Sequence, residues 1–111
     1  MKKIYRIKKY SEIDAIFKIK NVKSNAYFTV YQNHKTVNNH FRFAISIGKK
    51  YGNAVERNLI KRRIRMIISQ VKDKIGKVDF VIVIKKEAKQ LKYQKLNDEL
   101  IKLLNKSKIM E

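Results

Sequence analysis

The chain has 111 residues, a length that suits one compact domain, so residues 1–111 are expected to fold as a single domain. Its 28 Lys and Arg against 9 Asp and Glu give a formal net charge of +19, which favours nucleic acid as partner over an anionic membrane or a merely solvated surface. The absence of Cys excludes disulfide scaffolds and thiolate metal sites. No apolar run is long enough for a membrane span or a secretory signal, so we expect a cytoplasmic protein without a membrane partner.

The first predicted helix covers about residues 12–19. Ser11 is a suitable N-cap, and Asp14 stands where a capping-box partner would. Its apolar stripe consists of Ile13, Ile16 and Phe17.

Two segments follow that have the two-residue side-chain period of a β-strand, and both are predicted to be strands. The first is YFTVY at 27–31, and the second is FRFAISI at 41–47. The polar connector between them holds both histidines of the chain, His34 and His40.

A second helix is predicted from 54 to about 71, with Asn53 as N-cap and Glu56 as its capping-box partner. At 100° per residue, the helix separates an apolar stripe from a polar arc. The stripe consists of Ile60, Ile64, Ile67 and Val71, and the arc of Arg57, Asn58, Lys61, Arg62 and Arg65, with Ile68 as its one apolar member.

The remaining segments predict a buried strand at 80–84 (FVIVI) and a last helix over about 93–105. A strand–helix–strand connection from 41–47 to 80–84 implies that these two strands are parallel. The elements therefore predict an α+β sandwich, in which helices pack on a small mixed sheet.

The charge on the second helix is costly for an isolated protein. Arg57, Lys61 and Arg65 repeat at i, i+4, where like charges repel each other. Lys49, Lys50 and Arg57 also gather near the helix N-terminus, where the helix dipole is already positive. Phosphate groups bound there would reverse both costs, whereas the alternative is an ordinary solvated face.

Residues 49–65 fit the pattern K-K-x-G-N-A-V-x-R-N-x-x-K-R-x-x-R, which resembles the signature helix of the bacterial ribonuclease P protein subunit. Further similarity lies in Arg6-Ile7-Lys8-Lys9, Phe17, Tyr31 and Ser46-Ile47-Gly48. The resemblance implies the element order αβββαβα, a short strand near 19–24 and a left-handed βαβ crossover, against the usual right-handed preference. The segment 19–21 lacks the Gly usual in the family, and Ile13 replaces a residue that is often aromatic.

By this resemblance, the chain is a subunit of an endoribonuclease in which a catalytic RNA removes the 5′ leader of precursor tRNA. The implied partners are the ribonuclease P RNA subunit and precursor tRNA, with no obligate protein partner. The implied RNA-subunit-binding residues are Lys49, Lys50, Asn53, Arg57, Asn58, Lys61, Arg62 and Arg65, and the implied leader-binding cleft consists of Lys9, Ile13, Phe17, Tyr31 and Ser46. Mg²⁺ would serve the holoenzyme through its RNA, with none held by the protein alone.

The chain shows no pattern of a protein catalytic site, and we predict neither catalytic nor metal-binding residues. The two histidines lie in a polar connector without a nearby acidic run, and the carboxylates are scattered along the chain. A structural rRNA-binding or ribosome-assembly protein could look the same. The two hypotheses differ in whether the protein increases cleavage of precursor tRNA.

Overall fold

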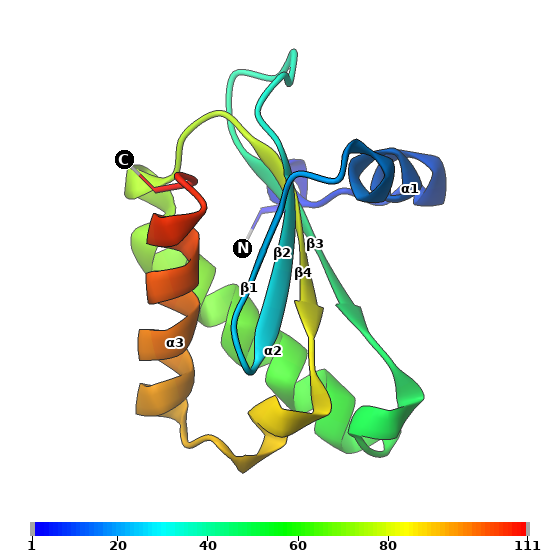
Figure 1. Ribbon diagram of the computed structural model, residues 1–111, viewed down its shortest axis with the longest axis vertical. Helices are drawn as coiled ribbons and strands as arrows, with labels where there is room; N and C mark the ends of the chain where they lie inside the picture. Colours follow the sequence, from blue (N-terminus) through cyan, green and yellow to red (C-terminus); the bar gives the residue numbers. More distant parts are fainter. Residues whose placement is uncertain (1, 111) are drawn as a thin grey trace.

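The computed structural model describes residues 2–110 as three α-helices and a four-stranded sheet, with four short 3₁₀ turns (Figure 1). The helices are α1 (Tyr10–Ile19), α2 (Ala54–Val71) and α3 (Tyr93–Lys106), and the strands are β1 (Val22–Ser24), β2 (Phe28–Asn33), β3 (Arg42–Ile47) and β4 (Asp79–Ile84). The 3₁₀ turns are η1 (Lys3–Tyr5), η2 (Lys49–Tyr51), η3 (Lys72–Lys74) and η4 (Lys86–Gln90). Within residues 2–110, no helix is both long enough and apolar enough to cross a membrane.

The sheet is mixed and has the strand order β1-β2-β4-β3. β2 pairs antiparallel with both β1 and β4, whereas β3 runs parallel to β4 with Phe43 opposite Phe80. The predicted parallel pair and the α+β class are therefore confirmed.

The crossover through α2 has the left-handed sense that the resemblance implied. In Figure 1 both parallel strands point downward, β4 lies to the left of β3, and α2 lies behind the sheet. The sequence pattern alone would have favoured the opposite hand.

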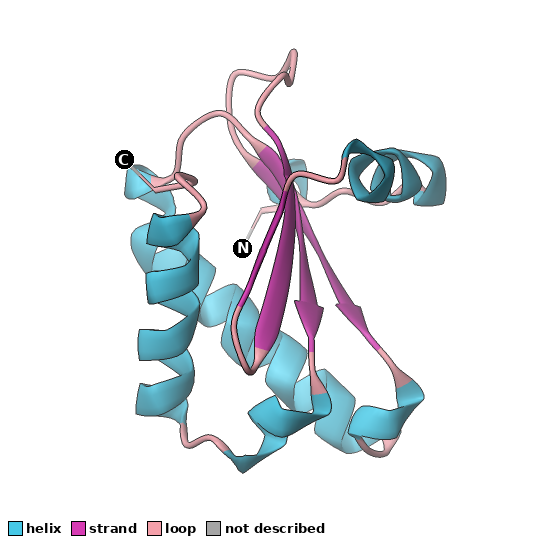
Figure 2. Cartoon of the chain, in the orientation of Figure 1, coloured by secondary structure: helices cyan, strands magenta, loops and turns pink. Residues whose placement is uncertain are grey.

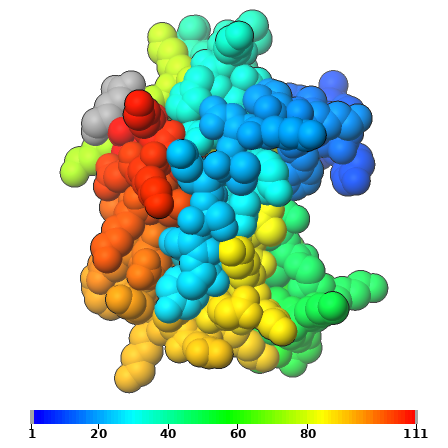
Figure 3. Space-filling model, in the orientation of Figure 1, coloured from blue at the N-terminus to red at the C-terminus, as the bar shows by residue number. Residues whose placement is uncertain are grey.

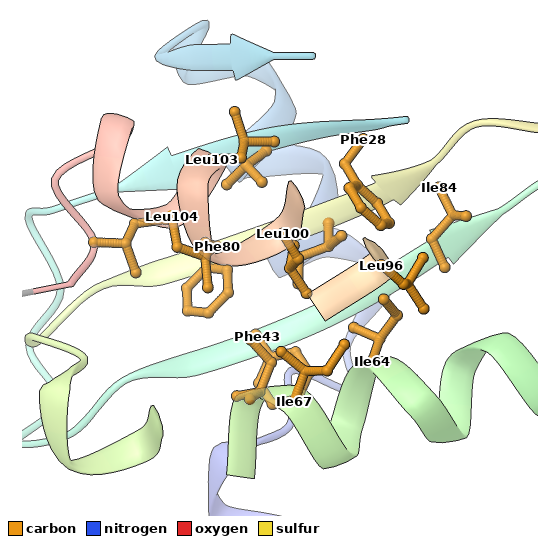
Figure 4. Packing of buried hydrophobic residues seen from close by; sticks show 14 of the residues in the cluster. Phe28, Phe43, Ile64, Ile67, Phe80, Ile84, Leu96, Leu100, Leu103 and Leu104 are labelled. Carbon is orange, nitrogen blue, oxygen red and sulfur yellow. The ribbon is translucent and has the colours of Figure 1, made fainter. Parts of the chain in front are cut away.

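Strand alternation gives the sheet two different faces, as Figure 2 shows with α1 on one side and α2 and α3 on the other. One face carries Phe28, Phe43 and Phe80 into the main core. Figure 4 shows how Leu100 of α3 and Ile64 of α2 point toward this face. The opposite face carries Tyr31, Ala44 and Val81, which pack with α1 in a second, smaller cluster.

The start of α1 differs from the prediction. The helix begins at Tyr10 with Lys9 as N-cap, so Ser11 lies inside the first turn and caps nothing. Asp14 pairs with Lys18 at 3.0 Å instead of closing a capping box. A backbone hydrogen bond from Ile7 to Phe43 O, 3.0 Å, fixes the chain before the helix, so tertiary contact outweighs the local cap.

The C-terminus of α1 shows why a Gly is usual in this segment. Lys20 is the C-cap and has φ 61°, ψ 22°, a left-handed conformation that glycine adopts freely. The strand that follows, β1, is the short strand that the resemblance implied and that residue patterning did not reveal.

The buried stripe of α2 is wider than predicted. Ile68, assigned to the polar arc, has 0% exposure because α3 also packs against α2. Val71, assigned to the stripe, is only half-buried at the last residue of the helix.

Candidate nucleic-acid interface

The N-terminus of α2 is fixed by the predicted capping box. Asn53 Oδ1 accepts a hydrogen bond from the Glu56 backbone N–H at 2.9 Å, and Glu56 Oε1 accepts one from the Asn53 N–H at 3.0 Å. Glu56 Oε2 also pairs with Lys89 Nζ of η4 at 2.7 Å. Asn53, to which the resemblance assigns a contact with RNA, therefore has a structural role at the same position.

Gly52 leaves room for the close approach of this capping carboxylate. A Cβ at position 52 would lie 2.5 Å from Glu56 Oε1 and 3.2 Å from Lys89 Nζ. Any larger residue would displace the Glu56 side chain from the box. The Gly-Asn pair of the signature pattern thus sets the start of α2.

The Glu56 carboxylate is stabilised in its charged form. The hydrogen bond from Lys89 lowers the pKa of Glu56, and the bond from the Asn53 backbone N–H lowers it further. The acid at the helix start therefore already has its own cation, and the neighbouring basic residues remain available.

The basic arc, defined as Arg57, Asn58, Lys61, Arg62 and Arg65, lies along one side of α2. Asn58 and Arg62 are exposed, while the other three members are half-buried along the flank of the helix. Within residues 2–110, none of its four cations forms an ion pair, and the buried Arg57 Nε has no hydrogen-bond partner. The arc is thus a row of charges without counter-ions.

Arg65, at the C-terminal end of the arc, lies near Ile13, a residue of the predicted leader cleft. It lines a cavity of about 170 Å³ together with Arg6, Ile13 and Ala44. Burial lowers the pKa of Arg65, and the charge of Arg6 lowers it further. The cavity joins the basic arc to the α1 side of the sheet.

Lys49 and Lys50 lie in η2, immediately before the capping box. Both side chains are exposed, so their charges add to the positive end of the α2 dipole. Their placement agrees with a surface that would accept an anion at this end of the helix.

The residues predicted for the leader cleft lie on and around the α1 side of the sheet. The rings of Phe17 and Tyr31 meet edge to face with centroids 4.8 Å apart, and Ile13 packs in the same cluster. Ser46 is half-buried on β3, two residues beyond Ala44 and therefore on the same face. Lys9 is exposed at the N-cap of α1.

Arg42 is a residue that the sequence reasoning missed. Its Nη2 donates to Glu12 Oε2 of α1 at 2.7 Å and to Asp79 Oδ2 of β4 at 2.8 Å, while its Nε reaches Asp79 Oδ1 at 3.3 Å. The hydrogen bond to Asp79 raises the pKa of Arg42 against the opposing effect of burial, and Glu12 raises it further. We call this contact the Arg42 bridge, because it ties α1 to the sheet beside the cleft.

Strand alternation puts Arg42 on the same face as Ala44 and Ser46. The sequence could not show its partners, which are 30 and 37 residues away. Arg6 belongs to the segment that resembles the family, yet its position beside Arg65 follows only from the fold. Both residues needed tertiary structure to be found.

Comparison with known proteins decides the family. The family model described as Ribonuclease P matches residues 1–108. The chain is 46% identical over 113 residues to the ribonuclease P protein component of Acholeplasma laidlawii, covering 100% of this chain and 96% of that protein. This chain belongs to the ribonuclease P protein family. It is also 47% identical over 111 residues to the family member from onion yellows phytoplasma, with 99% of this chain and 79% of the other covered.

Solved ribonuclease P proteins share the fold. The Staphylococcus aureus RNase P protein superposes with a TM-score of 0.91 at 34% identity, covering 96% of this chain and 98% of that one. The Thermotoga maritima protein gives a TM-score of 0.83 at 26% identity, with 91% and 96% covered. These matches confirm the resemblance drawn from the signature helix.

Proposed function

We propose that this chain is the protein subunit of a ribonuclease P ribonucleoprotein that removes the 5′ leader from precursor tRNA. The chemistry would belong to the RNA subunit, and the protein would bind that RNA and the leader. The observation that carries the proposal is the basic arc of α2, whose four cations have no counter-ion within residues 2–110.

The basic arc would act by neutralising phosphates of the RNA subunit. Each phosphate contact releases condensed counterions, and the binding therefore weakens steeply with salt. The same surface would continue to the N-terminus of α2, where the helix dipole is positive and Lys49 and Lys50 are exposed. Phosphate groups of the RNA would bind there as well. If the RNA subunit binds along the basic arc of α2, the α1 side of the sheet stays free for a second RNA segment.

The cleft on the α1 side would hold the single-stranded leader. Aromatic side chains next to cations form sequence-tolerant platforms for unpaired bases. Phe17 and Tyr31 lie together here, and Lys9 is exposed at the N-cap of α1. The half-buried Ser46 offers a hydroxyl on the same face. Because Arg65 and Ile13 share a cavity, leader and RNA subunit would meet along one continuous surface.

Mg²⁺ enters this proposal through the RNA subunit, whose phosphates would hold it. The protein would strengthen that binding indirectly, by screening repulsion between RNA segments that must come together. No group of three or more His, Asp or Glu side chains comes together within residues 2–110 in a way that could hold a metal ion. The proposed setting is the cytoplasm.

The test is cleavage of precursor tRNA by a bacterial ribonuclease P RNA at low, near-physiological Mg²⁺, with and without the protein. We expect a strong gain in the cleavage rate when the protein is present. Binding to the RNA without any gain in cleavage would instead favour the structural rRNA-binding function.

A further inference from the structure

A second basic site lies at the edge of the sheet opposite β3. The C-terminal end of α3 meets β1 and the end of β2 there, and Figure 3 shows the red end of α3 beside the blue start of β1. Between them is a cavity of about 440 Å³. Its lining includes Asn21, Lys23, Gln32, His34, Lys106 and Lys108.

The base of this cavity is an ordered polar network. Gln32 is polar but only 2% exposed, because it lies on the same strand face as the core residues Phe28 and Val30. Its Oε1 lies 2.8 Å from His34 Nε2, and its Nε2 donates to Asn21 Oδ1 at 3.4 Å. The buried amide therefore orients both neighbours and leaves the Asn21 amide N–H groups available to donate.

The rim of the cavity is positively charged. Lys23 lies on β1, Lys106 is the last residue of α3 and Lys108 follows that helix, and no carboxylate lines the cavity. Within residues 2–110, none of the three lysines forms an ion pair.

The helix end does not itself need these lysines. The last carbonyls of α3 already accept hydrogen bonds from the chain: Ser107 N–H donates to Leu103 O at 2.9 Å, Lys108 N–H to Asn105 O at 3.1 Å, and Ile109 N–H to Leu104 O at 3.1 Å. Lys108 also has φ 59°, at a position where glycine is the unstrained choice. A lysine in a strained position, facing an uncompensated basic cavity, suggests a role for its charge.

We propose that this cavity binds the phosphodiester backbone of RNA, as a contact separate from both the basic arc and the leader cleft. Ammonium groups and an amide donor supply the recognition of phosphate oxygens. No aromatic residue other than the His34 ring lines the cavity, so the contact reads the backbone and not the base. The inference rests on the proposed function for the identity of the RNA.

The experiment measures the affinity of the full chain for a bacterial ribonuclease P RNA at fixed ionic strength. The test variant combines Lys23→Gln, Lys106→Gln and Lys108→Gly. The control combines Lys74→Gln, Lys92→Gln and Lys95→Gln, which remove the same charge from exposed positions that do not line the cavity. We expect the test variant to bind about tenfold more weakly than the control, as three partly exposed charge pairs would give.

Two further measurements separate binding from folding and RNA from free phosphate. Lys108→Gly alone should leave the melting temperature unchanged or raise it, because glycine accepts the left-handed conformation. Titration of pyrophosphate into the wild-type chain should shift the backbone amide NMR signals of residues 21–23, 32–34 and 106–108.

The proposal is overturned if the test and control variants lose affinity equally. It is also overturned if pyrophosphate shifts these signals while the RNA affinity of the test variant matches the control, because the site then takes free phosphate. Failure of the wild-type chain to bind the RNA at all would overturn the proposed function as well, which separates the two claims.

Discussion

Arg42 joins α1 to the sheet through side-chain hydrogen bonds. Its guanidinium joins Glu12 of α1 to Asp79 of β4, and the side chains of Arg42 and Asp79 are only 20% and 9% exposed. Within residues 2–110, Arg42 is the one cation paired with Asp79. A buried carboxylate that loses such a partner remains in a poorly solvated site, which is costly. The bridge thus links α1 to the stability of the sheet.

We therefore expect Arg42→Met to lower the free energy of unfolding by about 3–5 kcal/mol, because Asp79 is left without a partner. Glu12→Gln, on the more exposed side of the bridge, should cost less than about 1 kcal/mol. Denaturant unfolding of both variants checks this. Equal and small losses of unfolding free energy in the two variants would show that the Arg42–Asp79 contact contributes little to stability.

Phe17 is the residue that tests the cleft. Phe17→Ala should weaken binding of the reconstituted holoenzyme to precursor tRNA by about 1–3 kcal/mol, the contribution of one stacked base, with mature tRNA little affected. Phe17→Leu keeps apolar volume against Tyr31 but removes the ring, so it should lose leader affinity without loss of fold. Equal weakening for both tRNAs would contradict a leader cleft.

At the level of elements, α2 is held at its start by the contacts of Glu56 with Asn53 and Lys89. Because the pKa of Glu56 is lowered on folding, its charge adds stability that is fully present above the unfolded pKa. That contribution declines as the pH falls below the ordinary value of 4.5 and is lost below the folded pKa.

The matching variant is Glu56→Gln, which keeps the shape of the capping box but removes the charge. We expect it to be less stable than wild type at pH 7, and the difference to shrink steadily as the pH falls below 4.5. Thermal unfolding at a series of pH values measures this. A difference that stays constant down to low pH would exclude a charge effect.

The accuracy of the sequence predictions differed between elements for physical reasons. The bounds of α2 were predicted correctly, because the Asn53 cap and the apolar period are both local signals. β1 could not be predicted from the sequence pattern, because all three of its residues are exposed and buried and exposed positions do not alternate along it. The N-cap at Ser11 was wrong because contacts of the preceding chain with β3 decide where α1 begins.

The same distinction applies to the candidate site. The basic arc could be read from helical spacing alone, and the structure places its members on one side of α2. The Arg42 bridge and the Arg6–Arg65 cavity depend on residues far apart in sequence, and the left-handed crossover that brings them together opposes the general preference. Their prediction required either the family resemblance or the structure.

For the whole molecule, the net charge of +19 includes the cations of the basic arc along α2, and α1 packs its aromatic Phe17 on the opposite face of the sheet. The α1 cluster and the basic arc meet at the cavity shared by Ile13 and Arg65. This arrangement suits a protein that holds two RNA segments next to each other. The central claim is that the basic arc is the face bound by the RNA subunit.

The most direct test is the salt dependence of binding to a bacterial ribonuclease P RNA, compared between wild type and a variant with Arg57→Gln, Lys61→Gln and Arg65→Gln. We expect the slope of log K against log salt to become shallower by about two to three, as loss of three phosphate contacts requires. The Lys74, Lys92 and Lys95 control variant should keep a slope near that of wild type. An unchanged slope in the arc variant, or an equal change in the control, would contradict the account and leave the arc as a solvated face.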